Sequence, residues 1–573
     1  MDRNEIKRLR EINTEKALYE IESVIRSSTF DSSNIFAAAY VLLNAGKFNR
    51  PPLDSMDDYF RACPDSEERT MFIRHALEKN WHGIADILTK VTEDELKAIL
   101  LFYEPAGIRW GNEATPDSII KLALQLLNIK KGDKVADFGT GHAAFLREAY
   151  VVEPDAFYTG IEINTTDKEI ASIRAKLLGE NVCIEQGNIL DTKKHARTFD
   201  VAFSNYPFGA RTSDAIFRKD GDIEKIAENP AFARTASMDW LFNAAVYGSI
   251  AGPRRAVCIM TNGSTWNTLD KGARKHFIAS GSVEAVIALP DKIFEYTSIA
   301  TTLIVFSHGN SDVMMVDARD LCEKGRRLNL ITEDSVEKIV ECCKAETLIS
   351  RHISYSELAE NDFVLNPVRY LTNEKTITNG VEFSSVIKNI TRGAQLKASD
   401  LDEMMSETPT DTQYLMLGNI QNGIIDEELP YLREIDQRLE KYCIQDGNLI
   451  LSKNGAPFKI AVAAIRPGQK LLANGNLYVI ELDQNKADPF FVKAFLESDI
   501  GEATLRSITV GTAIPNIGVE QLKRIKIPDI PLEKQKEIAM KYQAKVDEVK
   551  ILRRKTEKAL SSLKHLFDEY KEE

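Results

Sequence analysis

The segment Asn205-Tyr206-Pro207-Phe208 brings together a side-chain amide, a rigid proline and an aromatic ring, which are groups that could line a ligand site. Residues 199–203 before it form a hydrophobic run typical of a buried strand. Ligand sites of α/β proteins lie at the carboxyl ends of such strands. Asn205 offers a side-chain amide that can form hydrogen bonds, and Phe208 offers an aromatic ring. The alternative is an ordinary strand-ending turn, because Asn and Pro both interrupt strands.

Two signals upstream point to a ligand that contains a nucleoside. Asp137 lies in a strand-like run, and Gly139 and Gly141 follow it just before a stretch of helical periodicity. Glycines at a strand-to-helix turn let the backbone approach a ligand, whose polar groups then meet the helix N-terminus. Glu162 lies near the end of the next strand-like run, where an acid can accept hydrogen bonds from both hydroxyls of a ribose. Otherwise Glu162 is a solvated residue at a strand end.

The elements that must position these residues indicate an α/β protein. Residues 109–310 alternate short runs rich in Val, Ile and Phe with helical stretches. This order predicts a mostly parallel, Rossmann-like sheet with helices on both faces. Residues 1–108 carry apolar side chains at helical spacings and are predicted to form a helical N-terminal domain.

The second half of the chain changes character. Residues 311–375 are interpreted as a connector, and residues 376–531 as a second α/β domain rich in strands and glycine-centred turns. Residues 532–573 are predicted to form one long helix. Its apolar side chains follow a heptad spacing that indicates either a helix-pairing seam or an amphipathic helix lying on its own domain. These residues are Ile538, Tyr542, Val549, Leu552, Ala559, Leu563, Leu566 and Tyr570.

Residues 110–306 resemble the modification subunit of type I restriction-modification systems, an N6-adenine DNA methyltransferase. Residues 111–116 (GNEATP) resemble its motif X, and residues 137–146 its motif I. Residues 160–164 resemble motif II, and Asn205 to Phe208 resemble motif IV. The resemblance implies S-adenosylmethionine as the methyl donor and a catalytic role for Asn205, Tyr206, Pro207 and Phe208. It also implies a set of donor-binding residues and no metal. That set is Thr115, Asp137, Gly139, Gly141, Glu162 and Asn188.

Four positions depart from the family's pattern. Phe138 replaces the proline that usually follows the acid, and Ala143 stands where a third glycine is common. Asn188 stands where an acid contacts the donor's adenine, so it can accept a hydrogen bond but carries no charge. Tyr206 replaces the first proline of motif IV. That position acts through its backbone carbonyl, so the expected cost is a less rigid loop.

The C-terminal part resembles a target-recognition domain of the type I specificity subunit. The residues that carry this resemblance are 449–462 and 507–538. It implies binding of double-stranded DNA, with bases read in the major groove and phosphates held by basic side chains. Each candidate is equally well explained as plain surface charge. The candidates are Lys453, Lys459, Lys523, Arg524 and Lys526.

Methyltransferase and recognition domains in one chain predict a self-contained, sequence-specific DNA modification enzyme. The terminal helix could make it a homodimer or bind a partner subunit, and a separate nuclease could act with it. Pro64-Asp65 and Glu95-Leu96-Lys97 match a nuclease pattern in letters, but both lie in helical sequence. Two alternatives stay open. The chain could be a catalytically impaired DNA-binding protein, or it could methylate RNA or protein.

Composition places the chain among ordinary globular proteins. Its 73 basic and 86 acidic residues give a net charge of −13, which argues against polyanion binding by the whole surface. The seven cysteines are scattered, which predicts reduced thiols rather than a disulfide framework. The charged N-terminus is unlike a signal peptide, and no apolar stretch is long enough to span a bilayer. We therefore expect a cytoplasmic protein without membrane contact.

Overall fold

The computed structural model describes residues 1–25, 33–47, 55–104, 114–210, 229–232, 238–371 without 296 and 298, 377, 380–510 without 456, and 516–565. The chain divides into two compact units, residues 1–371 and residues 372–573, and each is described by itself.

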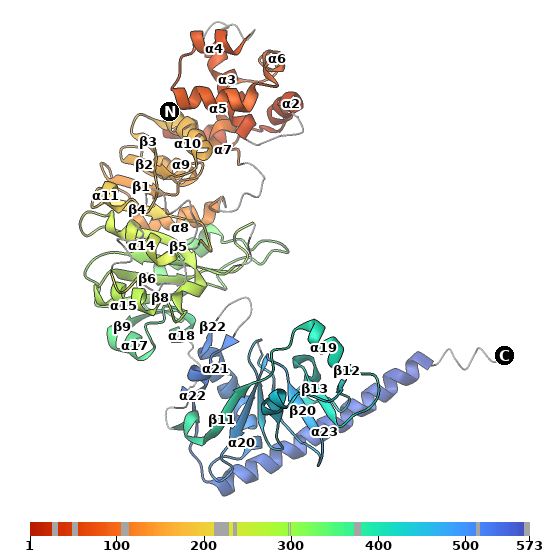
Figure 1. Cartoon of the computed structure of the whole chain (residues 1–573). Coiled ribbons are helices and arrows are strands. Elements are labelled where there is room, and N and C mark those ends of the chain that lie inside the picture. The colour runs from red at the N-terminus through yellow and green to blue at the C-terminus, as the bar shows by residue number, and fades with distance from the viewer. Residues whose placement is uncertain are drawn as a thin grey trace, which may run out of the picture. The chain divides into compact units, whose positions relative to one another are not determined.

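The first unit begins with helices, as predicted (Figure 1). Ser55 and Ser66 cap α4 and α5, and a Thr92–Glu95 capping box begins α7. Apolar side chains at helical spacing form one buried cluster around α3, and the later helix α10 (Thr165–Leu178) also contacts this cluster. The helices are α1 (Arg3–Arg10), α2 (Glu15–Ile25), α3 (Ser33–Lys47), α4 (Met56–Ala62), α5 (Glu67–Leu77), α6 (Trp81–Ile84) and α7 (Glu93–Phe102).

A mixed sheet forms the centre of the first unit. Its strand order is β3-β2-β1-β4-β5-β7-β6-β8-β9. The pairs from β3 to β5 are parallel, whereas β7 runs antiparallel to β5 and β6. The strands are β1 (Lys134–Phe138), β2 (Phe157–Glu162), β3 (Val182–Gln186), β4 (Val201–Ser204), β5 (Ala256–Thr261), β6 (Val283–Ala288), β7 (Thr301–Phe306), β8 (Asp312–Asp317) and β9 (Ser350–Ser354).

Helices cover both faces of this sheet, as the α/β prediction requires. Alternate strand residues such as Val135 and Ala136 belong to two different buried clusters, one on each face. One face is covered by α8 (Asp117–Leu127), α9 (Ala144–Val152), α10 (Thr165–Leu178) and α16 (Glu333–Cys342). The other is covered by α14 (Asp239–Gly248), α15 (Lys271–Ala279), α17 (Tyr355–Glu360) and α18 (Val368–Leu371). The short α11 (Thr192–His195) precedes β4.

Residues 311–375 differ from the predicted connector. Strand β8 pairs with β6, and β9 pairs with β8, so this segment extends the central sheet of the first unit. Helix α16 packs on α8 over the same sheet. Strand β6, the partner of β8, precedes it in the sequence, and β7 lies between them. A short apolar run such as Val313–Val316 does not indicate which other strand it will pair with.

The second unit is built from small sheets and helices. A four-stranded antiparallel sheet has the order β11-β21-β18-β19, and a five-stranded sheet has the order β12-β16-β13-β20-β17. The strands are β10 (Gly380–Glu382), β11 (Ile387–Arg392), β12 (Met405–Ser406), β13 (Thr412–Leu415), β14 (Ile420–Gln421), β15 (Ile424–Ile425), β16 (Tyr431–Leu432), β17 (Cys443–Ile444), β18 (Leu449–Ser452), β19 (Ile460–Val462), β20 (Lys470–Ala473), β21 (Leu477–Leu482), β22 (Thr509–Val510), β23 (Asn516–Ile517) and β24 (Lys526–Pro528). The helices are α19 (Ala398–Met404), α20 (Pro489–Leu496), α21 (Asp499–Ser507), α22 (Val519–Arg524) and α23 (Leu532–His565).

The long helix α23 behaves differently along its length. Its first half packs on α20. Ala539 is buried there, and the hydroxyl oxygen of Tyr542 accepts a hydrogen bond from the buried Lys493. Farther along, Leu552 and Leu563 are exposed, whereas the heptad positions Leu566 and Tyr570 lie outside the described residues. None of the described helices has the length and apolar character that crossing a membrane requires.

Candidate active site

The turn between β1 and α9 places backbone at the carboxyl edge of the sheet. Gly139 and Gly141 adopt positive φ angles of 74° and 53°, and Ala143 has a φ of 62°. A Cβ atom on Gly141 would meet no heavy atom within 4 Å, so the space beside this backbone is open. These three residues, Gly139, Gly141 and Ala143, define the donor turn. It can accept a ligand close to the main chain.

Glu162 lies at the end of β2 and contacts the donor turn directly. One carboxylate oxygen accepts a hydrogen bond from the backbone N–H of Gly141 at 2.9 Å, and the other accepts from that of Asn164 at 2.8 Å. Burial raises the pKa of Glu162, although the backbone hydrogen bonds oppose this. A carboxylate has about four acceptor positions, so acceptor capacity remains for a ligand beside the turn.

Asp137 is a buried carboxyl group at the end of β1. Its Oδ2 accepts a hydrogen bond from the Thr140 hydroxyl at 2.7 Å. Burial raises the pKa of Asp137 to about 7, although the Thr140 hydrogen bond lowers it. A positively charged group placed beside Asp137 would favour the ionised carboxylate.

Asn188, predicted to contact the donor's adenine, is buried in the loop after β3. Its Oδ1 accepts a hydrogen bond from the backbone N–H of Leu190 at 3.0 Å. This bond stabilises the loop, and it occupies part of the acceptor capacity that donor contact would need.

Asn205 follows β4, and its amide is oriented by a residue from motif X. The Asn205 Nδ2 donates a hydrogen bond to Oγ1 of Thr115 at 2.9 Å. The Oδ1 atom is buried and has no hydrogen-bond partner among the described residues. Thr115, predicted to bind the donor, therefore lies against the Asn205–Phe208 segment, while residues 111–113 of motif X lie outside the described residues. A buried acceptor without a donor is costly unless a ligand supplies one.

Tyr206 is anchored by its side chain. Its hydroxyl donates a hydrogen bond to Oδ1 of Asn243 on α14 at 3.0 Å, and its ring centroid lies 4.8 Å from that of Phe242. Pro207 and Phe208 are half-buried, and the Phe208 ring meets Phe294 edge-on at 5.2 Å. Sequence reasoning missed Asn243, since a single Asn in an apolar helix gives no signal of its partner.

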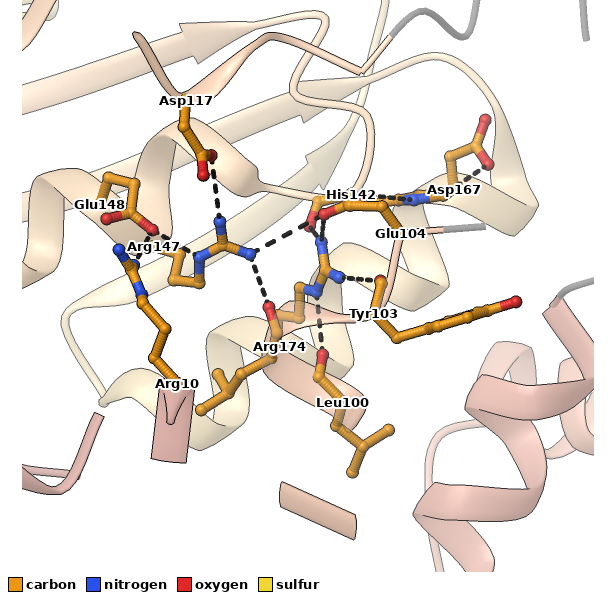
Figure 2. Close-up of polar contacts among 11 residues, drawn as sticks. Arg10, Leu100, Tyr103, Glu104, Asp117, His142, Arg147, Glu148, Asp167 and Arg174 are labelled. Carbon is orange, nitrogen blue, oxygen red and sulfur yellow. Dashed lines mark hydrogen bonds and ion pairs between the residues drawn. The ribbon is translucent and has the colours of Figure 1, made fainter. Parts of the chain in front are cut away.

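A polar cluster beside the donor turn was also missed. Figure 2 shows the guanidinium groups of Arg147 and Arg174 pointing toward Glu104, with His142 next to it. His142 occurs in the sequence segment GTGH, within motif I, and its position was the one available signal.

The predicted DNA-binding residues of the second unit have different surroundings. The Lys459 Nζ donates a hydrogen bond to the carbonyl of Leu417 at 2.9 Å, and Lys523 pairs with Glu520 at 3.0 Å. Burial, with a smaller effect from the nearby charge of Arg392, lowers the pKa of the Lys453 ammonium. Arg524 and Lys526 are exposed. Lys459 and Lys523 thus already have structural partners.

The residues of the nuclease pattern make structural contacts within the N-terminal helical region. Asp65 accepts a hydrogen bond from the Tyr40 hydroxyl, and Glu95 completes the capping box of α7. Lys97 pairs with Glu5 and Glu93. Within the described ranges, no group of three or more His, Cys, Asp or Glu side chains could hold a metal ion.

Known proteins match both halves of the chain. Residues 86–378 match the family N-6 DNA Methylase, and residues 406–560 match the family Type I restriction modification DNA specificity domain. The first match covers just over half of the 573 residues. The chain therefore belongs to the N-6 DNA methylase family and carries a type I specificity domain in the same polypeptide.

Individual relatives agree with this assignment. The type I restriction enzyme HindI methylase subunit of Haemophilus influenzae is 26% identical over 349 residues, which cover 54% of this chain and 74% of that protein. The type I restriction enzyme MjaVII methylase subunit of Methanocaldococcus jannaschii is 25% identical over 305 residues, which cover 48% of this chain and 52% of that protein. The chain thus spans about half the length of the second relative.

A solved DrdV–DNA complex shares the fold, with a TM-score of 0.50 at 10% identity, and it covers 94% of this chain and 69% of that chain. The family matches confirm the predicted family, the α/β fold class and the enzyme class, an N6-specific DNA methyltransferase joined to a specificity domain.

Proposed function

We propose that the first unit binds S-adenosylmethionine and methylates the N6 amine of an adenine in double-stranded DNA, at a sequence chosen by the second unit. The observation that carries this proposal is the buried Oδ1 of Asn205, which has no hydrogen-bond partner among the described residues. Because Thr115 accepts a hydrogen bond from Nδ2 of the same amide, Oδ1 is left to accept a hydrogen bond from a bound ligand. The exocyclic amine of adenine is such a donor.

The residues at the sheet edge fit the proposed methyl donor. Glu162 would accept hydrogen bonds from ribose hydroxyls with its remaining acceptor capacity, and the open space at Gly141 leaves room beside the backbone. Asp137 is a buried carboxyl group that a cationic ligand would ionise. When bound, S-adenosylmethionine supplies an electrophilic methyl group on a positively charged sulfur.

The segment Asn205–Phe208 would activate the amine through hydrogen bonding. The amine of adenine is a poor nucleophile because its lone pair is conjugated with the ring. Asn205 Oδ1 and the carbonyl of Tyr206 would accept its two N–H bonds and stabilise the positive charge that develops on nitrogen during attack. Phe208 would stack on the base. Since the amine cannot be reached inside a duplex, the adenine must be flipped out of the stack.

The second unit supplies the DNA contacts in this proposal. Lys453 is the strongest of the predicted phosphate ligands, because Arg392 lies nearby and a phosphate would neutralise both charges. Lys459 and Lys523 are weaker candidates, because each already has a partner within the unit.

Assembly is proposed through α23. Its exposed residues include Leu552 and Leu563, which match the predicted heptad and leave apolar surface for a second helix. A two-fold dimer would read two half-sites, and a partner subunit would use the same surface. A separate nuclease is a further candidate partner.

Sequencing that detects N6-methyladenine in DNA from cells expressing the chain tests the function. We expect the modified base at one recurring sequence, and we expect a chimera with a foreign recognition domain to modify a different sequence. A folded chain that binds the donor but modifies no DNA would favour the catalytically impaired alternative. A chimera that keeps the original sequence would contradict the role given to the second unit.

A further inference from the structure

The C-terminal end of α7, the last helix of the N-terminal region, lies against the donor turn. Such a helix end leaves carbonyl groups without partners inside the helix. Here two buried arginines donate hydrogen bonds to these carbonyl groups. Arg174, on α10, donates to the carbonyls of Leu100 at 2.9 Å and Tyr103 at 2.6 Å. Arg147, on α9, donates to the carbonyl of Leu101 at 2.7 Å.

Arg174 also binds the donor turn itself. Its Nη1 donates to the backbone carbonyl of His142 at 2.6 Å and to Oε1 of Glu104 at 2.9 Å. Arg147 lies 3.8 Å from the same Glu104 oxygen. One fully buried guanidinium therefore joins the end of α7, the side chain of Glu104 and the backbone between Gly141 and Ala143.

His142 joins the same parts through its imidazole ring. Its Nδ1 lies 3.3 Å from Oε2 of Glu104, and its Nε2 lies 3.2 Å from Oδ1 of Asp167 on α10 (Figure 2). Burial lowers the pKa of His142, but the hydrogen bonds to Asp167 and Glu104 raise it more, so the result is above its usual value even with the charge of Arg174 nearby. A protonated ring can donate to both carboxylates at once, whereas a neutral ring can donate to one.

Glu104 carries a full negative charge in this setting. Although burial raises it, the charge of Arg174 and the hydrogen bond to His142 lower the pKa of Glu104 to about 2. The carboxylate is therefore the shared acceptor of a cation from α10 and of the imidazole from the donor turn.

The backbone that these groups hold is strained. Ala143 adopts a left-handed conformation with a φ of 62°, which is unfavourable for a residue with a Cβ atom. Such a conformation persists where the surrounding structure fixes it. His142 is the residue between Gly141 and Ala143, so its bonds to Glu104, Asp167 and Arg174 act directly on that backbone.

We infer that Glu104, His142 and Arg174 form a positioning cluster through which the N-terminal helical region holds the donor turn in its ligand-binding conformation. The inference rests on the proposed function, because the ligand of the turn is the proposed methyl donor. Loss of the cluster should therefore weaken donor binding more than it slows methyl transfer.

Calorimetric titration of the full chain with S-adenosylmethionine tests this inference. Glu104→Gln keeps the size of the side chain but removes the charge, and it presents an amide to His142 or Arg174. We expect about a tenfold rise in Kd for the donor, the effect of losing one charge-assisted hydrogen bond. His142→Gln, which cannot bridge two carboxylates as an imidazolium can, should act in the same direction. For both variants kcat at saturating donor should change little, since Asn205 and Tyr206 are untouched.

Glu169→Gln is the matched control. Glu169 forms a buried ion pair at 2.7 Å with Arg69, and this pair also joins the helical region to α10 but does not touch the donor turn. The control should lower the melting temperature at least as much as Glu104→Gln and leave the donor Kd unchanged. An unchanged Kd in both cluster variants, or an equal loss of affinity in the control, would overturn the inference. A wild-type chain that binds no donor would instead contradict the proposed function.

Discussion

The hydroxyl of Tyr206 donates a hydrogen bond to Oδ1 of Asn243 at 3.0 Å, and both side chains are buried. Tyr206 stands where the family's motif IV has its first proline. A proline stiffens the loop by fixing φ, whereas this tyrosine is held by a hydrogen bond to α14 and by its contact with Phe242. The loop that carries the proposed carbonyl acceptor is therefore fixed by a different physical means.

Tyr206→Phe should slow methyl transfer. It removes the anchoring hydroxyl and leaves Oδ1 of Asn243 without its donor, which should lower stability by about 1–3 kcal/mol. A loosened carbonyl at position 206 should lower kcat by about ten- to a hundredfold, because the amine is then poorly placed. Steady-state kinetics and thermal unfolding measure the two effects.

The double variant Tyr206→Phe/Asn243→Leu separates positioning from stability. Removing both partners of a buried hydrogen bond restores much of the stability, but the anchor stays absent. We expect a stable enzyme that is still slow. Recovery of kcat together with stability would show that the hydrogen bond only supports folding.

Thr115→Val should reveal whether Thr115 serves the amine or the methyl donor. Valine has nearly the same shape but cannot accept from Nδ2 of Asn205. We expect kcat to fall about tenfold, as for one lost hydrogen bond, with little change in the donor Kd. Thr115→Ser, which keeps the hydroxyl, should stay close to wild type. A rise in donor Kd without a fall in kcat would instead make Thr115 a donor-binding residue.

Donor binding should depend on pH through Asp137. The pKa of Asp137 is raised to about 7 mainly by burial, and a cationic donor would lower it by favouring the carboxylate. Binding should therefore release a proton, and affinity should rise as the pH rises from about 6 to about 8. Asp137→Asn removes this titration but keeps His142, so titrations of both proteins isolate the contribution. An equal pH dependence in both would contradict the role of Asp137.

Lys453 and Lys459 should respond differently to alanine substitution. Loss of Lys453 should weaken DNA binding and reduce the salt dependence of affinity by about one phosphate contact. Lys459→Ala should instead lower stability, because Nζ of Lys459 donates to the Leu417 carbonyl within the unit. Fluorescence anisotropy at several salt concentrations checks both. A larger effect on DNA binding from Lys459→Ala would reverse the assignment.

The sequence predicted what depends on neighbouring residues. The turn after Asp137, the acid at Glu162 and the Asn205 segment each lie at one strand end, so local pattern and strand order bring them to one edge. The pairings of Arg174 with Glu104 and of Tyr206 with Asn243 join residues 70 and 37 positions apart, and no local pattern encodes them. The error at residues 311–375 has the same origin, because β8 is recognised through its distant partner β6.

Methyl transfer by the purified Asn205→Ala chain is the most direct measurement of the proposed chemistry. At saturating donor, and with a duplex that wild type modifies, we expect kcat to fall by about 10²–10³-fold, as when one transition-state hydrogen bond is removed. Affinity for the donor and for the duplex should stay close to wild type. In the proposed mechanism Oδ1 of Asn205, unpartnered among the described residues, contacts the adenine amine and neither the donor nor the rest of the duplex. Transfer at nearly the wild-type rate would contradict the assignment of Asn205 as the acceptor that activates the base.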